Sequence, residues 1–249
     1  MGLFLQKTNI IRDYLEDYVD GRAFWPQTIW KKYSQSGDLG YFADQSKAEN
    51  REASRQCLNE LVTDALELVP DCLMYLSKLT CPEVFRFCAI PQVMAIATLE
   101  SLYNNLNVFT GVVKIRKGMA CKLVLNSSNV TEVHNSFNAF AKSIETKAKG
   151  MKAAGIEDGS YERTMKACKV IIERTDEAYI SKRNRGILYK CFVPMGVVLA
   201  SSSYQRYSRL GEIESYGISS TLIASSLAFG WTLHSFGFGS KLQAEPKKL

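Results

Sequence analysis

The sequence predicts an all-α protein, and two patterns carry that prediction. Apolar residues recur every three to four positions through several long segments, which is the spacing that gives a helix one buried face. Nowhere does a series of short segments alternate apolar and polar residues as strands would. The hydrophobic share of 46% and the charged share of 22% are ordinary for a folded chain, so we expect a packed helical core.

Residues that break helices divide the chain into its expected elements. The predicted helices cover residues 2–19, 51–79, 84–106, 131–152 and 161–182. Gly21 and Pro26 end the first of them, and a short helix is expected after Pro26. Residues 34–50 are rich in Ser, Gly, Asp and Lys, which predicts an exposed loop. Residues 108–125 contain the basic stretch V-V-K-I-R-K-G-M-A-C-K.

The end of the chain has a different composition. Residues 218–239 contain no Asp, Glu, Lys or Arg, and a stretch of that length matches a hydrocarbon core of about 30 Å. We therefore expect a membrane anchor there, with a buried C-terminal helix as the alternative. Residues 187–204 are a weaker candidate, because a lysine and a proline interrupt them. The expected division is a helical domain at 1–185 and a hydrophobic region at 186–249.

Composition excludes several kinds of site. The chain has two histidines, His134 and His234, which are too far apart in sequence for a zinc site of the H-E-x-x-H type and are poor material for a Ser-His-Asp triad. Its seven cysteines are scattered without a C-x-x-C pair, which favours reduced thiols over a disulfide framework. The net charge of +6 fits anionic partners. We expect no nucleic acid among them, because the cations are not interleaved with aromatic residues.

The first predicted helix has one strongly acidic face. At about 100° per residue, Asp13, Glu16 and Asp17 fall on the same side, with Asn9 and Gln6 one and two turns earlier. Carboxylates so close repel each other unless a cation compensates, and Mg²⁺ prefers such oxygen ligands. The pattern therefore predicts a magnesium site, with a solvated acidic surface as the alternative.

Three blocks of sequence resemble the squalene synthase family in the family's own order. The first is L-F-L-Q-K-T-N-I-I-R-D-Y-L-E-D with G-R-A-F-W-P after it, which resembles the family's second aspartate-rich motif. The second is F-C-A-I-P-Q-V-M-A-I-A-T-L at Phe87–Leu99, and the third is V-K-I-R-K-G at Val113–Gly118. The resemblance implies an all-α isoprenoid synthase fold around a central cavity.

The resemblance also implies an activity, cofactors and a location. The family joins two farnesyl diphosphates head to head into presqualene diphosphate, which it then reduces to squalene with NADPH, while Mg²⁺ assists the departure of diphosphate. This is a step of sterol-precursor synthesis. We accordingly expect a monomer anchored by its C-terminus in the endoplasmic reticulum membrane, with the catalytic part facing the cytosol.

Roles of individual residues follow from the matched motifs. The resemblance implies that Asp13 and Asp17 hold Mg²⁺ and the substrate diphosphate, with Glu16 supporting the metal. It implies that Gln6 and Asn9 line the cavity near the second reaction. It also implies two further sets of residues: a cofactor set of Asn9, Arg12, Lys114 and Arg116 around the NADPH phosphates, and a pocket wall of Phe87, Cys88, Pro91 and Gln92 that shelters the carbocation during catalysis.

The sequence departs from the family in one respect. The family has a first aspartate-rich motif of the D-T-x-x-D type and a catalytic tyrosine upstream of the first matching block, and this chain has neither. We therefore expect a chain that corresponds to the C-terminal half to two-thirds of the enzyme and is catalytically poor alone. Two alternatives remain: a phytoene-type synthase, which couples without a reductant, and a non-catalytic tail-anchored helical protein.

Overall fold

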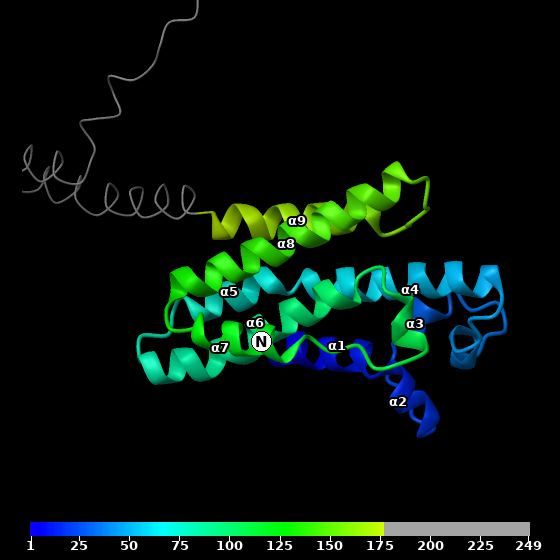
Figure 1. The fold of residues 1–249 in the computed structure, drawn as a ribbon, viewed down its shortest axis with the longest axis horizontal. Helices are drawn as coiled ribbons and strands as arrows, with labels where there is room; N and C mark the ends of the chain where they lie inside the picture. The colour runs from blue at the N-terminus through cyan, green and yellow to red at the C-terminus, as the bar shows by residue number, and fades with distance from the viewer. Residues whose placement is uncertain (177–249) are drawn as a thin grey trace, which may run out of the picture. The chain divides into compact units, whose positions relative to one another are not determined.

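Residues 1–176 are described by the structure, a computed structural model, and they fold into helices without a strand. Figure 1 shows α4, α5 and α6 in the middle of the unit, with α1 on one side and the α8–α9 pair on the other. The elements are α1 (Gly2–Arg12), α2 (Tyr14–Val19), α3 (Gln27–Trp30), the 3₁₀ turn η1 (Leu39–Phe42), α4 (Ala48–Leu66), α5 (Val69–Leu76), α6 (Pro82–Leu102), η2 (Leu106–Phe109), α7 (Lys117–Leu125), α8 (Val130–Ala153) and α9 (Tyr161–Thr175).

Local sequence explains where several helices begin. Pro70 and Pro82 lie in the first turns of α5 and α6, where a missing backbone N–H removes no helical hydrogen bond. At the start of α8 the Asn129 side chain accepts a hydrogen bond from the Glu132 amide at 3.0 Å. The Glu132 carboxylate accepts one in return from the Ser128 amide at 3.0 Å. This reciprocal pair satisfies amides that the helix leaves unpaired.

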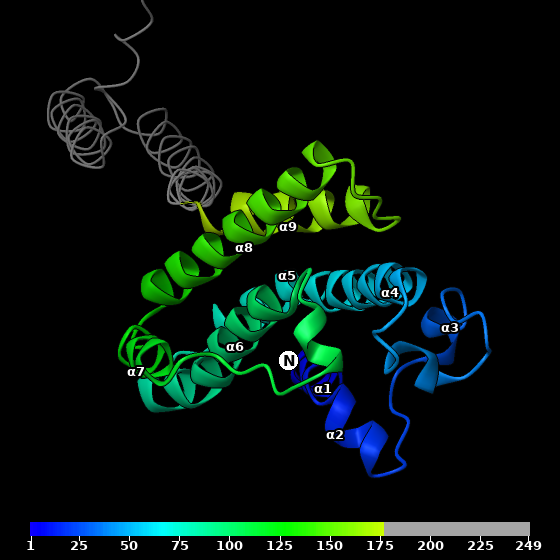
Figure 2. The same ribbon diagram turned by 45° about the vertical axis from the view of Figure 1, so that its right-hand side comes forward.

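The core forms where the long helices meet. Helices α8 and α9 pack against each other over most of their length, and α6 packs against α8 and α1 (Figure 2). The centre of α6 is fully buried at Ala89, Val93, Ile96 and Leu99. Within the described residues, α6 is the one helix long and apolar enough to cross a membrane. Its buried centre and its neighbours mark it as the core helix of this unit.

Several boundaries differ from the sequence prediction. The predicted helix at 161–182 ends as α9 at Thr175, because Asp176 is extended. The predicted helix at 2–19 breaks at Asp13 into α1 and α2, and the predicted helix at 51–79 divides into α4 and α5 just before Pro70. Pro70 has no backbone N–H to donate to the Leu66 carbonyl four residues earlier, so the second break follows from the sequence. The loop predicted to be exposed at 34–50 instead contains η1, whose Leu39 and Phe42 are buried in the core.

An aromatic cluster surrounds the break at Asp13. The Tyr14 ring lies 4.6 Å from Trp25 and 5.0 Å from Phe109, measured between ring centroids. The Trp25 indole N–H donates a hydrogen bond of 2.8 Å to the carbonyl of Ile10, in the last turn of α1. The Tyr14 hydroxyl donates one of 2.9 Å to the Leu39 carbonyl. These contacts hold α2 at a defined angle to α1.

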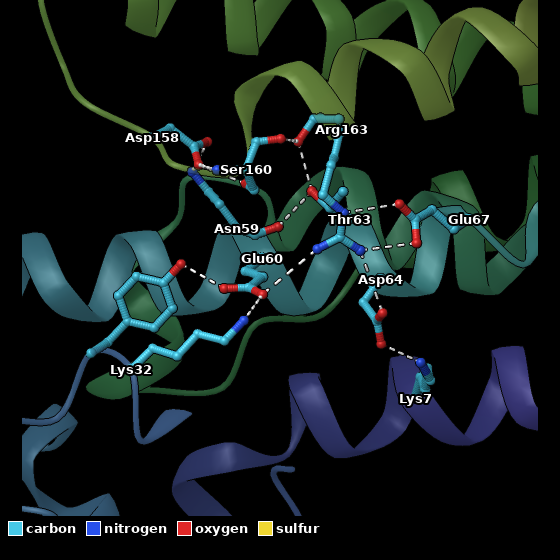
Figure 3. Close-up of polar contacts among 12 residues, drawn as sticks. Lys7, Lys32, Asn59, Glu60, Thr63, Asp64, Glu67, Asp158, Ser160 and Arg163 are labelled. Carbon is cyan, nitrogen blue, oxygen red and sulfur yellow. Dashed lines mark hydrogen bonds and ion pairs between the residues drawn. The ribbon is translucent and has the colours of Figure 1, made fainter. Parts of the chain in front are cut away.

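A polar network on α4 ties three other parts of the fold to this helix (Figure 3). Arg163 of α9 forms two hydrogen bonds to Glu67, at 2.9 and 3.1 Å, and lies 3.6 Å from both Glu60 and Asp64. Lys7 of α1 pairs with Asp64. The carboxylates of Glu60, Asp64 and Glu67 are one turn apart on α4, so the opposing cations offset their mutual repulsion.

Glu60 is the most buried carboxylate of this network, at 8% exposure. It accepts hydrogen bonds from the Lys32 ammonium at 2.5 Å and from the Tyr33 hydroxyl at 2.6 Å, just beyond the end of α3. Burial, followed by the hydrogen bond to Glu60, raises the pKa of Tyr33. Lys32 and Tyr33 therefore attach the α3 segment to α4 through one carboxylate.

The expected anchor at 218–239, the second apolar run at 187–204 and the domain boundary at 185 all lie outside the described residues. They stay predictions from the sequence.

The hydrogen bond at the break is tested by replacing Trp25 with phenylalanine. We expect Trp25→Phe to lower the free energy of unfolding by about 1 kcal/mol more than Trp30→Phe does, the usual net contribution of one hydrogen bond. Trp30 is a matched control: it is similarly buried, at 6% against 4%, and its indole nitrogen has no hydrogen-bond partner among the described residues. Urea unfolding followed by circular dichroism measures both, and equal losses would contradict the assignment.

The α4 network is tested by Glu60→Gln. The substitution removes the charge that pairs with Lys32 and Arg163, and we expect it to lower the free energy of unfolding by about 2 kcal/mol. The control is Glu162→Gln, because Glu162 is 84% exposed in its pair with Lys152 and such a surface pair contributes about 0–1 kcal/mol. Thermal and urea unfolding measure both variants, and an equally small loss of unfolding free energy in the two would refute the prediction.

Candidate functional site

A groove of about 420 Å³ lies between α1, α6 and the segment that leads into α7. Its lining comes from three distant parts of the sequence: Leu5, Thr8, Asn9 and Arg12 of α1; Pro91, Met94, Ala95 and Thr98 of α6; and Lys114, Ile115, Lys117 and Ala120. Four of these, Asn9, Arg12, Pro91 and Lys114, are residues for which the sequence predicts a role. The fold thus brings residues of all three matching blocks to one place.

The lining of the groove is mainly apolar between its charged residues. Ala95 and Ala120 have small side chains, which leave space between the helices that carry them. The hydroxyls of Thr8 and Thr98 donate to the carbonyls of Phe4 and Met94, one turn earlier, at 2.9 and 2.8 Å. Because those hydroxyls already have hydrogen-bond partners within their own helices, this part of the lining suits an apolar or aromatic ligand surface.

Cations line the groove as well. Arg12 reaches it from the last turn of α1, and Lys114 and Lys117 reach it from the segment before α7 and from its first residue. Arg116, which the resemblance assigns to the same role, is exposed and is not among the groove residues. Lys117 was missed by the sequence reasoning. Its signal was present in the K-I-R-K run, but the start of α7 decides which side chains of that run reach the groove.

Asp13 and Asp17 lie one helical turn apart despite the break between α1 and α2. The Asp17 amide donates to the Asp13 carbonyl at 2.9 Å, which keeps the two residues in register. Each carboxylate has an arginine partner: Asp13 accepts two hydrogen bonds from Arg12, at 2.7 and 2.8 Å, and Asp17 accepts one from Arg22 at 3.0 Å. The hydrogen bond to Asp13 raises the pKa of Arg12.

The predicted third ligand, Glu16, is exposed. In the part of the chain that the structure describes, no group of three or more His, Cys, Asp and Glu side chains is placed to hold a metal ion. Two carboxylates one turn apart still suit Mg²⁺, because this ion is commonly held by one or two carboxylates together with substrate phosphates. The donor set of Asp13 and Asp17 therefore fits the predicted metal, with Glu16 outside this pair.

The remaining predicted residues take different positions. Gln6 is exposed on α1 and does not line the groove. Cys88 is half-buried against the core, and Gln92 is 1% exposed, with a side-chain oxygen that has no hydrogen-bond partner among the described residues. Neither of these two residues of α6 lines the groove.

Phe87 is exposed at 78%, although it is a large aromatic residue. It lies four residues before Pro91 and seven before Met94, which places it on the groove side of α6. Pro91 has no backbone N–H, so the Phe87 carbonyl lacks its helical donor. An exposed phenylalanine beside an apolar groove is therefore a candidate for ligand contact.

Known proteins resemble this chain in sequence and in structure. Residues 1–118 match the squalene/phytoene synthase family. The squalene synthase of Mus musculus is 43% identical over 217 residues, covering 86% of this chain and 48% of that protein. The squalene synthase of Homo sapiens is 44% identical over 217 residues with the same coverage. The solved complex of TcSQS with E5700 has a TM-score of 0.64 at 39% identity, covering 72% of this chain and 49% of that one.

The helices and the groove they share define an all-α isoprenoid synthase fold, as the sequence predicts. The chain belongs to the squalene/phytoene synthase family. It spans about half the length of the curated relatives that it matches.

Phe87 and Phe85 make a matched pair for separating ligand contact from core packing. We expect Phe87→Ala to change the free energy of unfolding by less than about 0.5 kcal/mol, because the ring is exposed. Phe85→Ala should cost about 3–5 kcal/mol, since Phe85 is 4% exposed. Chemical unfolding measures both. A large loss for Phe87→Ala would assign that residue to the core.

Proposed function

We propose that this chain carries the diphosphate- and cofactor-binding side of a squalene synthase. The proposed reaction couples two farnesyl diphosphates into presqualene diphosphate and reduces this to squalene with NADPH, in sterol-precursor synthesis. One observation supports the proposal above the others: Asn9, Arg12, Pro91 and Lys114 come from three separate matching blocks and line one groove. The relatives' name, squalene synthase, supports the same reaction class.

The acidic pair suits the first step. Asp13 and Asp17 would hold Mg²⁺ against the diphosphate of the substrate, and the ion supplies Lewis-acid stabilisation of the negative charge that develops on the leaving group. Arg22 lies beside Asp17 and offers further positive charge to the departing anion. The apolar lining of the groove and the exposed Phe87 would keep water from the allylic cation that remains.

The cations of the groove suit the reductant. Arg12, Lys114 and Lys117 surround a space whose lining is otherwise mainly apolar, a combination that fits the phosphates and the flat rings of NADPH. An arginine at such a site binds phosphate through two parallel N–H groups, and lysines add point charges. The chain would thus orient the cofactor beside the wall formed by Pro91 and Met94.

We place the reaction at the endoplasmic reticulum membrane, on the strength of the charge-free stretch at 218–239. Squalene is a hydrocarbon, so a membrane surface is a suitable place to release it. The catalytic part would face the cytosol, where NADPH is available.

The cofactor half of the proposal is tested by binding. We expect the purified 249-residue chain to quench or shift NADPH fluorescence on binding, and Lys114→Ala combined with Lys117→Ala to weaken binding at least about tenfold. Losing one charge-assisted hydrogen bond costs about 1.5–3 kcal/mol, and about 1.4 kcal/mol is tenfold in affinity. The control is Lys122→Ala, an exposed α7 lysine outside the groove.

The outcomes separate the alternatives. Calorimetry with a non-hydrolysable farnesyl diphosphate analogue and Mg²⁺ reports on the acidic pair independently. Binding of the analogue without NADPH binding would favour a phytoene-type reaction, and binding of neither would favour a non-catalytic helical protein. We expect the chain alone to form little squalene from farnesyl diphosphate and NADPH, because it contains a single aspartate-rich motif.

A further inference from the structure

Arg12 lines the groove and is also paired with the acidic residue Asp13. Its side chain lines the groove together with Lys114 and Lys117. The same guanidinium donates two hydrogen bonds to Asp13, from Nε at 2.7 Å and from Nη2 at 2.8 Å. Asp13 is one of the two carboxylates that suit a magnesium ion. A single ion pair therefore connects the proposed metal site to the proposed anion site.

The second carboxylate has a partner of a different kind. Arg22 pairs with Asp17 and also with Asp20, each at 2.8–3.0 Å, and its side chain is 50% exposed. Arg22 does not line the groove. Both ion pairs join an arginine to an aspartate. They differ in position, because Arg12 lines the groove and Arg22 does not.

We infer that a divalent cation at Asp13 releases Arg12 to bind phosphate in the groove, so that cation and phosphate ligand bind cooperatively. This inference rests on the proposed function and names how its two binding sites are coupled. Without phosphate, Arg12 is paired with Asp13. With phosphate bound in the groove, Arg12 contacts the phosphate directly.

The physical reason is competition for the same oxygen atoms. Both oxygens of Asp13 accept hydrogen bonds from Arg12, so a hard cation that takes them displaces the guanidinium. Once displaced, Arg12 faces Lys114 and Lys117 across the groove, and three like charges there repel one another. A phosphate relieves that repulsion. Linkage then requires that phosphate in the groove also raises the affinity for the cation by the same factor.

The test compares two carboxamide variants of the full chain in detergent micelles. Asp13→Asn removes the charge that holds Arg12 and so imitates the cation-bound state. Asp20→Asn removes the same amount of negative charge from the Arg22 ion pair, which lies outside the groove and the proposed metal pair, and serves as the control. NADPH binding is measured by fluorescence at fixed ionic strength, without divalent cation and with saturating MgCl₂, and circular dichroism checks that each variant is folded.

We expect Mg²⁺ to raise the NADPH affinity of the unmodified chain by at least about fivefold, the lower end of common coupling factors. Asp13→Asn should bind NADPH with that higher affinity in the absence of Mg²⁺, and Asp20→Asn should not. Arg12→Gln gives a second reading, because its NADPH affinity should no longer respond to Mg²⁺.

Three results would overturn the inference in distinguishable ways. If NADPH binds but Mg²⁺ and Asp13→Asn leave its affinity unchanged, the coupling is wrong and the cofactor site stands. If Asp13→Asn and Asp20→Asn tighten binding equally, the effect is a general loss of negative charge and Arg12 has no special part in it. If NADPH binds to no variant under any condition, the cofactor part of the proposed function fails with the inference.

Discussion

The candidate site depends on how α1 is held against the rest of the fold. Phe4, Ile11 and Tyr14 are buried on one side of the first two helices, while Asn9, Arg12 and Asp13 lie on the other. The Lys7–Asp64 ion pair fixes α1 along α4, and the Trp25 hydrogen bond fixes its last turn. Without this two-sided attachment, the groove would lose one of its three walls.

Charged residues near the groove form ion pairs with one another, and the proposed ligands would replace such pairs. Between residues 12 and 22, Arg12 pairs with Asp13, and Arg22 pairs with Asp17 and Asp20. On the proposed function, a cation at Asp13 and a phosphate in the groove would together replace the Arg12–Asp13 pair and leave neither charge unpaired. This explains why an acidic pair and a basic groove can lie next to each other in one stable fold.

Much of the fold could be read from the sequence, because the long amphipathic helices have strong periodicity. Helices α6, α8 and α9 were predicted to within a few residues at most described ends. The break at Asp13 could not be predicted, since it depends on the packing of Tyr14 and Trp25 against Phe109, which is remote in sequence. Burial of the 3₁₀ turn at Leu39–Phe42 has the same kind of cause.

Site residues that belong to short motifs could be predicted from the sequence. Which of several adjacent residues faces the groove could not be predicted, because tertiary packing decides it. Arg12 and Lys114, two of the residues predicted to bind cofactor phosphates, line the groove together with Lys117, whereas the predicted Arg116 does not. That difference follows from the start of α7 at Lys117, which turns the chain from an extended segment into a helix. Gln92 and Phe87 lie in one matching block, yet one is buried and the other is exposed, because they occupy different sides of α6.

The central claim is that one groove joins α1, α6 and the start of α7 into a single cofactor site. Hydrogen–deuterium exchange of the chain with and without NADPH, in the presence of Mg²⁺, tests it most directly. The account predicts that NADPH slows amide exchange in three separate segments, 5–12, 91–98 and 114–120. Binding of NADPH with protection confined to one of these segments, or found elsewhere in the chain, would contradict it.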